Sequence, residues 1–405
     1  MRRPEFKPVW AMALIALAGC SMGCGGGSSH KNSLNPAAIS ASNVQPVVVN
    51  SGPAGNYANG LFTSITICVP SSSNCQTIDG VLVDTGSFGL RLLSSAGGGT
   101  LTLSLPHQTG SNGGSVGECA LFVSGFTWGS VNTADVNIAG EHASNVPVQI
   151  IDPTFATVPS SCKNTGVPEN DTLQSLGANG ILGVGPFAED CGLACAQTGS
   201  SNPGMYYNCI SGSCQIAAVA IRQQVQNPVA LFSSDNNGVM IQLPALTGAA
   251  PGLSGSMIFG IGTQSNNTVG LAEVFPVNSS GEFDTTFKGQ SYPAFVDSGS
   301  NAFFFLDSGI TGLSTCASNS GFYCPTSTQK LSAVTSSGGP NQTINFSVGN
   351  ADTLFSNRAN FVFENLGGPN PGTFDWGLPF FFGRTVFTAI DARSTPAGIG
   401  PFWAY

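Results

Sequence analysis

The sequence predicts an all-β protein with minor helix, built as two lobes with a cleft between them. Only 8% of the 405 residues are charged and 53 residues are glycine, whereas about a quarter of an average domain is charged. Short runs of alternating hydrophobic and polar residues, separated by turn residues, lie at 62–69, 133–138, 146–151 and 239–243, which is typical of strands. One motif also occurs once in each half of the chain, which indicates two related lobes.

The first 19 residues have the pattern of an export signal. A basic start is followed by an apolar stretch at 9–18, which is too short to span a bilayer as a lasting helix. The stretch ends in Leu17-Ala18-Gly19-Cys20. This ending resembles the bacterial lipobox, in which the cysteine is lipidated and becomes the new amino terminus. An ordinary cleavage site followed by an incidental cysteine is the alternative.

A lipidated Cys20 implies a bacterial cell-envelope protein that is anchored to a membrane through this residue. Ser21 follows it, as in lipoproteins that are not retained at the inner membrane, so we expect the outer membrane, facing the periplasm or the cell surface. Residues 20–43 are rich in Gly, Ser and Asn, which predicts a flexible tether. The rest of the chain suffices for an amino-terminal lobe at 44–268 and a carboxy-terminal lobe at 269–405.

One segment of the first lobe differs from the alternating strands. Within 216–226, Ala217, Ala220, Ile221 and Gln224 recur at helical spacing. We therefore expect a helix there.

The twelve cysteines fit an oxidising compartment. If Cys20 carries the lipid and Cys24 is the odd one out, ten remain for disulfides. The short spacings favour local bridges between Cys68 and Cys75 and between Cys316 and Cys324, and we expect a longer link between Cys119 and Cys162. The spacing of the last four could also suit zinc, but oxidation favours two further bridges, with the pairing left open, among Cys191, Cys195, Cys209 and Cys214.

Composition and motif context exclude several functions. A formal net charge of −9 argues against nucleic acid as a partner. Three histidines, His30, His107 and His142, are few for a metallohydrolase or a serine triad, since His30 lies in the expected tether. The segment 113–117 matches the G-x-S-x-G nucleophile elbow, but a loop-like stretch precedes it instead of the required strand. We expect no metal, no cofactor and a monomer.

The recurring motif is an aspartate at the end of an apolar run, followed by a hydroxyl residue, a glycine and a second hydroxyl residue. It reads Val83-Asp84-Thr85-Gly86-Ser87 in the first half and Val296-Asp297-Ser298-Gly299-Ser300 in the second. One such segment can simply be a strand that ends in a turn. Two of them, half a chain apart, indicate a duplicated hairpin that brings two carboxylates to a common centre.

Two adjacent carboxyl groups have a definite chemistry. They cannot both ionise easily, so they share one proton over a wide pH range. The charged member can take a proton from water while the neutral member donates one to a carbonyl oxygen, which is general acid–base hydrolysis.

The motifs and their order resemble the pepsin-like aspartic peptidases. The first catalytic loop of that family is similar to 83–94, and its second is similar to Val296–Ser300. Three further segments match family strands in order, at 179–185, 254–260 and 376–391. A lipobox on such a chain is also similar to an uncharacterised group of bacterial lipoproteins known as a domain of unknown function. The resemblance implies a two-lobed pepsin-like β-barrel architecture that binds a peptide or protein.

The resemblance also implies roles for the motif residues. Asp84 and Asp297 match the catalytic pair, and the residues that match the supporting loop positions are Thr85, Gly86, Ser87, Ser298, Gly299 and Ser300. We expect Ser87 and Ser300 to bond the outer carboxylate oxygens, and Thr85 and Ser298 to tie the loops together beneath.

The chain departs from the family pattern at the flap and behind the second aspartate. Family members carry a tyrosine on a hairpin flap over the cleft, and here Phe122 stands in its place, with Trp128 on the same hairpin. We expect Phe122 and Trp128 to contact a substrate. Arg91 replaces the supporting tryptophan, and Gly377-Leu378-Pro379 replaces the usual apolar-apolar-glycine.

Three functions follow as hypotheses. The retained aspartates and their flanking residues favour an aspartic endopeptidase. The departures favour a catalytically inactive module that binds a peptide or protein on the same scaffold. A structural envelope lipoprotein, in which the paired acids are relics of the fold, is the third.

Overall fold

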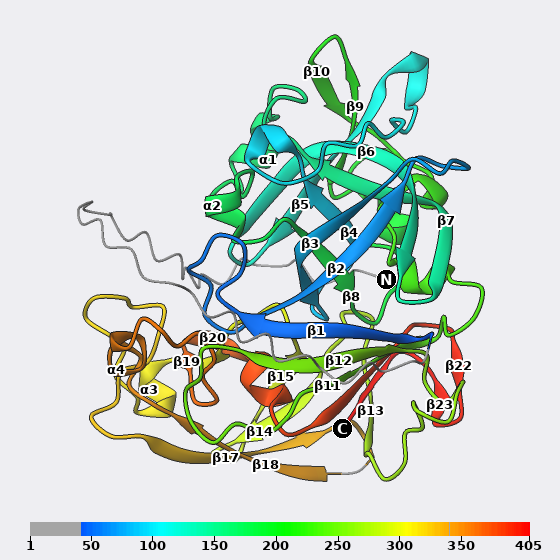
Figure 1. Ribbon diagram of the computed structural model, residues 1–405. Coiled ribbons are helices and arrows are strands. Elements are labelled where there is room, and N and C mark those ends of the chain that lie inside the picture. Colours follow the sequence, from blue (N-terminus) through cyan, green and yellow to red (C-terminus); the bar gives the residue numbers. More distant parts are fainter. Residues whose placement is uncertain (1–41, 340) are drawn as a thin grey trace, which may run out of the picture.

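The computed structural model describes residues 42–339 and 341–405 and consists mainly of strands (Figure 1). The predicted signal peptide, Cys20, Cys24 and His30, and the predicted tether as far as residue 41, lie outside the described residues. In Figure 1 residues 60–216 form the upper lobe and residues from 274 onward the lower lobe, with β1 and β12 crossing between them. The predicted mostly β, two-lobed architecture is confirmed.

The upper lobe contains a closed barrel. Its strands pair in the order β6-β7-β4-β8-β3-β2, and a further pairing between β2 and β6 closes the ring. The strands that make the ring are β2 (Gly60–Cys68), β3 (Cys75–Asp84), β4 (Phe88–Leu93), β6 (Gly125–Ile138), β7 (Glu141–Ile151) and β8 (Gly180–Val184). The strands β5 (Ser115–Phe122), β9 (Tyr206–Ile210) and β10 (Ser213–Ile216) extend it beyond β6.

The lower lobe is built on a second sheet with the order β18-β17-β14-β15-β20-β16-β19. Its strands are β14 (Phe283–Phe287), β15 (Gln290–Val296), β16 (Phe303–Leu306), β17 (Gln329–Ser336), β18 (Asn341–Val348), β19 (Gly367–Gly368) and β20 (Asn370–Trp376). A separate hairpin pairs β22 (Ser394–Thr395) with β23 (Gly398–Ile399).

A layer of strands from both halves of the chain joins the lobes. From β2 the upper sheet continues through β1, β12, β11, β21, β24 and β13. The predicted amino-terminal lobe supplies β1 (Val44–Asn50), β11 (Gly238–Gln242) and β12 (Leu253–Phe259), and the predicted carboxy-terminal lobe supplies β13 (Val274–Pro276), β21 (Thr385–Ala389) and β24 (Phe402–Ala404). The boundary expected at 268/269 therefore lies between two strands of this layer.

Helices are short and sit at the edges. The α-helices are α1 (Ser160–Lys163), α2 (Leu173–Leu176), α3 (Ser308–Thr311) and α4 (Ala351–Ser356). Single 3-10 turns lie at Ser95–Gly97, Ser111–Gly113, Gly192–Ala194, Ile221–Gln223, Pro228–Leu231 and Leu378–Phe381. In the described part of the chain no helix is both long and apolar enough to cross a membrane.

The helix expected at 216–226 is wrong. Ile216 ends strand β10, and only Ile221–Gln223 forms a single 3-10 turn. Ile216 pairs with Tyr207 of β9, and the Gln224 side chain bonds the backbone of Gly192 and Val219. Tertiary hydrogen bonds therefore override the helical spacing. The four strand predictions are confirmed, because they fall on β2, β6, β7 and β11.

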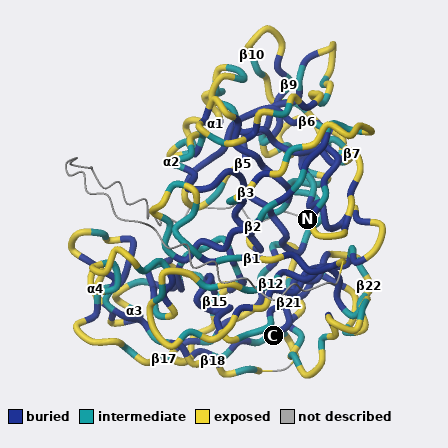
Figure 2. The backbone as a smooth tube through the Cα atoms, in the orientation of Figure 1, coloured by how far each residue is buried: buried dark blue, intermediate teal, exposed yellow. Residues whose placement is uncertain are grey.

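One continuous core runs through both lobes, and its composition differs between them. Figure 2 shows buried segments running through both lobes. The barrel core is aliphatic, with Ile65, Val81 and Leu90 among its fully buried residues, whereas the lower lobe stacks aromatic rings such as Phe305 and Phe374, whose centroids lie 5.0 Å apart. Burying aliphatic and aromatic surface of this kind is the main stabilising contribution to such lobes.

The predicted disulfides form. Bridges join Cys68 to Cys75, Cys119 to Cys162 and Cys316 to Cys324 as expected. The pairing that the sequence left open is Cys191 with Cys195 and Cys209 with Cys214. These four cysteines are therefore oxidised, and none of them offers a thiolate to zinc.

Candidate active site

The two motif aspartates stand in equivalent positions of the two lobes. Strand β3 ends at Asp84, and strand β15 ends directly before Asp297. In the upper lobe β8 runs between β3 and β4, and in the lower lobe β20 runs between β15 and β16. Each motif is thus a turn between two strands that a third strand separates, which places the turn at the end of a buried sheet.

Hydrogen bonds tie the two motif loops together. The Thr85 backbone N–H donates to Ser298 Oγ (3.1 Å), and the Ser298 backbone N–H donates to Thr85 Oγ1 (2.9 Å). The two hydroxyls then donate to the opposite strands, Thr85 to the Val296 carbonyl (3.0 Å) and Ser298 to the Val83 carbonyl (2.8 Å). Thr85 and Ser298 are fully buried, so these bonds fix the loops against each other.

Each carboxyl group lies against the glycine of the other loop. A Cβ atom at Gly86 would lie 2.6 Å from Cγ of Asp297, and one at Gly299 would lie 2.7 Å from Cγ of Asp84. Only a residue without a side chain allows this approach. The motif glycines therefore let the two aspartates meet.

Local donors hold each carboxylate. The backbone N–H of Gly86 donates to Asp84 (2.8 Å), and that of Gly299 donates to Asp297 (2.7 Å). The outer hydroxyls occupy the expected places, because Ser87 Oγ lies 2.5 Å from Oδ2 of Asp84 and Ser300 Oγ lies 2.9 Å from Oδ2 of Asp297.

The pair has the electrostatics of a shared proton. Burial raises the pKa of Asp84 well above its usual range, and the charge of Asp297 raises it further. Asp84 is 7% exposed, whereas Asp297 is half-buried and Gly86 is exposed. A buried protonated carboxyl beside a carboxyl that water can reach is the arrangement that acid–base hydrolysis needs.

Tyr57 is a site residue that the motifs do not reveal. It lies in the loop between β1 and β2, with its hydroxyl 3.5 Å from the Gly299 carbonyl. Burial and the charges of Asp84 and Asp297 raise its pKa, so the phenol stays neutral. Nothing in the local sequence marks Tyr57, because only the fold brings this loop to the aspartates.

Asp375 is a second residue that the motifs do not reveal. It precedes Trp376 in β20, is 5% exposed, and its Oδ2 lies 2.6 Å from Ser300 Oγ. Burial raises its pKa well above the usual range, as do the charges of Asp297 and Asp84. The sequence does contain a hint of this residue, since an acid between Phe374 and Trp376 interrupts an apolar run that is typical of a buried strand.

The register of β20 corrects the segment expected behind the second aspartate. Val83 pairs with Leu182 in the upper lobe, and the equivalent Val296 pairs with Trp376 in the lower lobe. The apolar-apolar-glycine segment 181–183 therefore corresponds to Asp375-Trp376-Gly377, not to Gly377-Leu378-Pro379. The glycine is retained, because a Cβ atom at Gly377 would lie 2.0 Å from the Ala302 carbonyl oxygen.

The two predicted flap residues occupy different places, one at the tip of the hairpin and one in the core. Phe122 ends β5 at the tip of the β5–β6 hairpin and packs against the same apolar cluster as Tyr57. Trp128, by contrast, is 0% exposed and packs with Tyr207 beside the Cys119–Cys162 bridge. The expectation that Trp128 contacts a substrate is therefore corrected: it supports the hairpin from inside.

Arg91 supports the flap through charge. Its guanidinium carbon lies 5.6 Å from the centre of the Phe122 ring, a cation–π distance. The same guanidinium binds Glu118 (2.7 Å) and Asp190 (2.8 Å), and all three side chains are buried. Burial and the charge of Glu118 raise the pKa of Asp190. The arginine at the place of the family tryptophan thus belongs to a buried ionic cluster.

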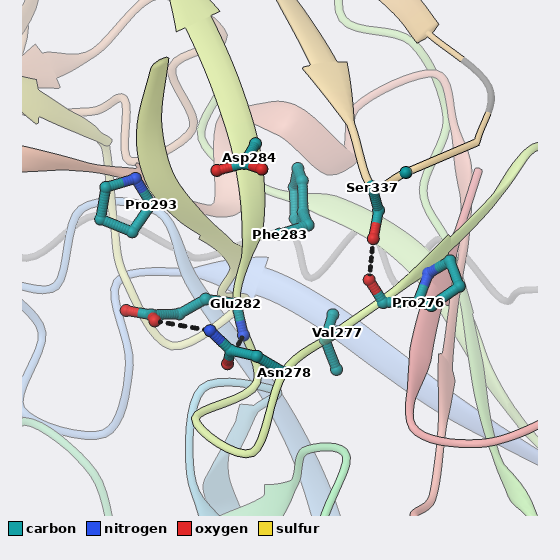
Figure 3. A pocket seen from close by; sticks show the side chains of 9 residues that line it. Pro276, Val277, Asn278, Glu282, Phe283, Asp284, Pro293 and Ser337 are labelled. Atoms are coloured by element: carbon teal, nitrogen blue, oxygen red, sulfur yellow. Dashed lines mark hydrogen bonds between the residues drawn. The ribbon is translucent and has the colours of Figure 1, made fainter. Parts of the chain in front are cut away.

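Other predicted residues and cavities lie apart from the aspartates. Ser115 of the G-x-S-x-G segment starts strand β5, so the strand–turn–helix of a nucleophile elbow is not formed. Figure 3 shows a pocket of about 320 Å³ in the lower lobe, where Glu282 accepts a hydrogen bond from Asn278 and Ser337 donates to the Pro276 carbonyl. A second pocket, of about 640 Å³, lies along Lys330, Phe346 and Arg384. Neither is lined by Asp84 or Asp297.

Comparison with known proteins agrees with this geometry. Residues 39–405 match a family model described as "Protein of unknown function (DUF3443)". No curated protein matches the chain. The crystal structure of aspartic proteinase from Irpex lacteus is similar to it, with a TM-score of 0.51 and 14% sequence identity over 89% of this chain and 96% of that chain. At this identity the likeness shows the fold, which is the two-lobed pepsin-like fold.

Proposed function

The chain belongs to the DUF3443 family, and we propose that it is an aspartic endopeptidase that hydrolyses peptide bonds in proteins. One observation carries the proposal: two hydrogen-bonded Asp-hydroxyl-Gly-Ser loops hold Asp84 and Asp297 against each other at a place that solvent reaches. Asp84 is buried and its pKa is raised, which supports a proton shared between the two aspartates. The pepsin-like fold supports the same activity by analogy only.

The reaction follows from the two protonation states. The charged aspartate takes a proton from a water molecule whose oxygen attacks the peptide carbonyl carbon. The neutral aspartate donates its proton to the carbonyl oxygen, and the tetrahedral intermediate then breaks at the C–N bond, with a proton delivered to the leaving amine. An extended peptide would lie beneath the β5–β6 hairpin and could add main-chain hydrogen bonds to it.

Activity of the purified full-length chain on unfolded protein tests the proposal. We expect cleavage at mildly acidic pH, because the pair must keep one proton and one charge. Asp84→Asn and Asp297→Asn should each abolish cleavage, while thermal unfolding shows that both variants stay folded. Asp307→Asn is the matched control, since Asp307 caps helix α3 through the Ile310 N–H and an asparagine keeps that cap. Cleavage that persists in either dyad variant would contradict the proposal.

A binding module on the same scaffold is the second candidate. It is favoured by the flap, where Phe122 has no hydroxyl to offer and where Leu121 and Val123 are 54% and 63% exposed. Exposed apolar residues at a hairpin tip suit contact with a peptide or protein. If the wild-type chain neither cleaves protein nor binds a statine-type inhibitor but retains a peptide ligand, the binding function replaces the peptidase.

We also propose that the protein is anchored in the bacterial envelope through a lipid on Cys20. The lipobox motif Leu17-Ala18-Gly19-Cys20 supports this, and the five disulfides fit an extracytoplasmic compartment. Cys20→Ala should move the protein from the membrane to the soluble fraction, whereas the control Cys24→Ala should stay with the membrane. Intact-mass analysis that finds an unmodified amino terminus at another residue would refute the anchor.

A further inference from the structure

The outer hydroxyl of the second motif lies within hydrogen-bonding distance of two carboxyl groups. Ser300 Oγ lies 2.9 Å from Oδ2 of Asp297 and 2.6 Å from Oδ2 of Asp375. A hydroxyl has one proton to donate. If both carboxyls were ionised, one of them would be left without its donor. The other oxygen of Asp375, Oδ1, is buried and has no hydrogen-bond partner among the described residues.

The first lobe has no such competition among its described residues. Ser87 donates to Asp84, and the position equivalent to Asp375 is Ile181. Two registers give this equivalence: Ile181 pairs with Leu82 and Arg91, and Asp375 pairs with Phe295 and Phe304, the matching residues of the second lobe. Asp375 thus adds a carboxyl to an otherwise repeated arrangement.

We propose that Asp375 is a positioning residue that controls, through the Ser300 hydroxyl, whether Asp297 receives a hydrogen bond. Neutral Asp375 donates its proton to Ser300 Oγ, so that the Ser300 hydroxyl donates to Asp297. Ionised Asp375 accepts the Ser300 hydroxyl instead, and Asp297 loses this donor. The inference rests on the proposed peptidase function and adds a third carboxyl group whose protonation affects the reaction.

The charges around Asp375 favour its neutral form at acidic pH. The strands packed against β20 carry no Lys, Arg or His, because β15 reads Gln-Ser-Tyr-Pro-Ala-Phe-Val and β16 reads Phe-Phe-Phe-Leu. The charged groups that act on Asp375 are Asp297 and Asp84, both acids. Burial and these like charges oppose the ionisation of Asp375. At acidic pH its neutral carboxyl group therefore donates a hydrogen bond to Ser300, and as the pH rises the ionised carboxylate accepts one.

The pH profile of cleavage tests the role. In the wild type, activity falls at high pH when either the Asp84–Asp297 pair or Asp375 loses its proton. In Asp375→Asn only the Asp84–Asp297 pair can lose one. The amide that this substitution introduces mimics the neutral acid, so we expect kcat near the optimum to stay within about twofold of wild type. The alkaline limb of the profile should move to higher pH, because the variant has one group fewer whose loss of a proton lowers activity. Asp375→Leu should share this shift but have a lower kcat at unchanged KM, since it cannot orient Ser300.

Thermal unfolding provides a readout that does not need activity. An acid whose pKa is raised in the folded state stabilises the fold fully below the unfolded pKa, and this contribution is lost as the pH rises through the folded pKa. The Tm of the wild type should therefore fall relative to that of Asp375→Asn as the pH rises above about 4, the usual pKa of an aspartate. The control Asp307→Asn should show no such divergence.

The outcomes separate the two proposals. If the full-length chain does not cleave protein but the Tm curves diverge, the peptidase function fails and the carboxyl role of Asp375 stands. In a Ser300→Ala background Asp375→Asn should no longer move the alkaline limb, because the link to Asp297 is cut. If Asp375→Asn and Asp375→Leu keep both the wild-type pH profile and the wild-type pH dependence of Tm, the proposal is overturned.

Discussion

The smallest residues of the site set its tightest distances. At Gly86 and Gly299 each motif loop brings its backbone directly against the carboxyl group of the other loop. The hydroxyl pairs on either side hold the acids in place, but they do so only because no Cβ atom separates the loops. The geometry of the aspartate pair therefore depends on the lack of side chains at these two glycines.

Gly86→Ala tests this at the residue scale. The added methyl group would lie 2.6 Å from Asp297 Cγ, so the Asp297 carboxyl group or the first motif loop must move. We expect loss of cleavage and a fall of about 1–3 kcal/mol in the free energy of unfolding, measured by urea denaturation. Gly339→Ala is the control, because the nearest atom to its Cβ would lie 3.9 Å away. Full activity in Gly86→Ala would contradict this prediction, because it would show that the motif loops can move to accommodate the methyl group.

Two strands and one loop carry the polar groups that pack beneath the β5–β6 hairpin. Arg91 lies in β4 and Glu118 in β5, and Asp190 follows in the loop after β8. Tyr206 of β9 donates to the other oxygen of Asp190 (2.7 Å). The cluster thus connects the first motif hairpin, the flap and the extension of the barrel, so its charge balance governs how these elements pack.

Arg91→Met tests the cluster at the element scale. It would leave two acids buried without their cation, which costs about 3–5 kcal/mol of stability in comparable sites. The charge of Arg91 lowers the pKa of Asp190, so its removal raises that pKa further and makes the ionised form of Asp190 more costly to bury. The destabilisation, measured by urea denaturation, should therefore be larger near neutral pH than in acid. Adding Glu118→Gln and Asp190→Asn should restore much of it. Equal destabilisation at both pH values would argue that lost packing, not charge, is responsible.

At the scale of the whole molecule, Asn59 adds a buried side-chain link between the lobes to the shared strand layer and to the bonds of Thr85 and Ser298. Besides the shared layer of strands, the Asn59 amide donates to the carbonyls of Asn301 (2.9 Å) and Phe363 (2.8 Å) and accepts from the Phe363 N–H (2.7 Å). Asn59 closes the loop that carries Tyr57 and is fully buried. It thus fixes an upper-lobe loop to the residue beside Ser300.

Asn59→Gly should weaken this joint. Asn59 has a left-handed backbone, with φ 50°, which glycine accepts without strain. The variant therefore isolates the loss of the amide, and we expect about 1–3 kcal/mol less stability from the unpaired Phe363 groups. Asn59→Ala should lose more, because it adds backbone strain. Asn145→Gly, at an exposed asparagine with φ 56°, should be close to neutral in the same urea titration. A stable Asn59→Gly would mean that the strand layer and the bonds of Thr85 and Ser298 hold the lobes together without the Asn59 amide.

Much of the fold and the centre of the site could be predicted from the sequence. The alternating runs predicted β2, β6, β7 and β11, and the paired motifs predicted that Asp84 and Asp297 face each other. The prediction failed where a neighbour in space decided the outcome. The helical spacing at 216–226 was overridden by pairing with β9, and Trp128 proved to be buried behind the flap.

By itself, the sequence determined the features that neighbours along the chain control. Strand alternation, the turn chemistry of the two motifs and the short-range bridges such as Cys68–Cys75 depend on residues a few positions apart. Only the tertiary structure decided that Tyr57, Asn59 and Asp375 belong to the site, and that Asp375-Trp376-Gly377 lies behind the second aspartate. These assignments depend on strand register and on burial, which arise when distant segments pack together, and no local pattern encodes which strand will lie beside which.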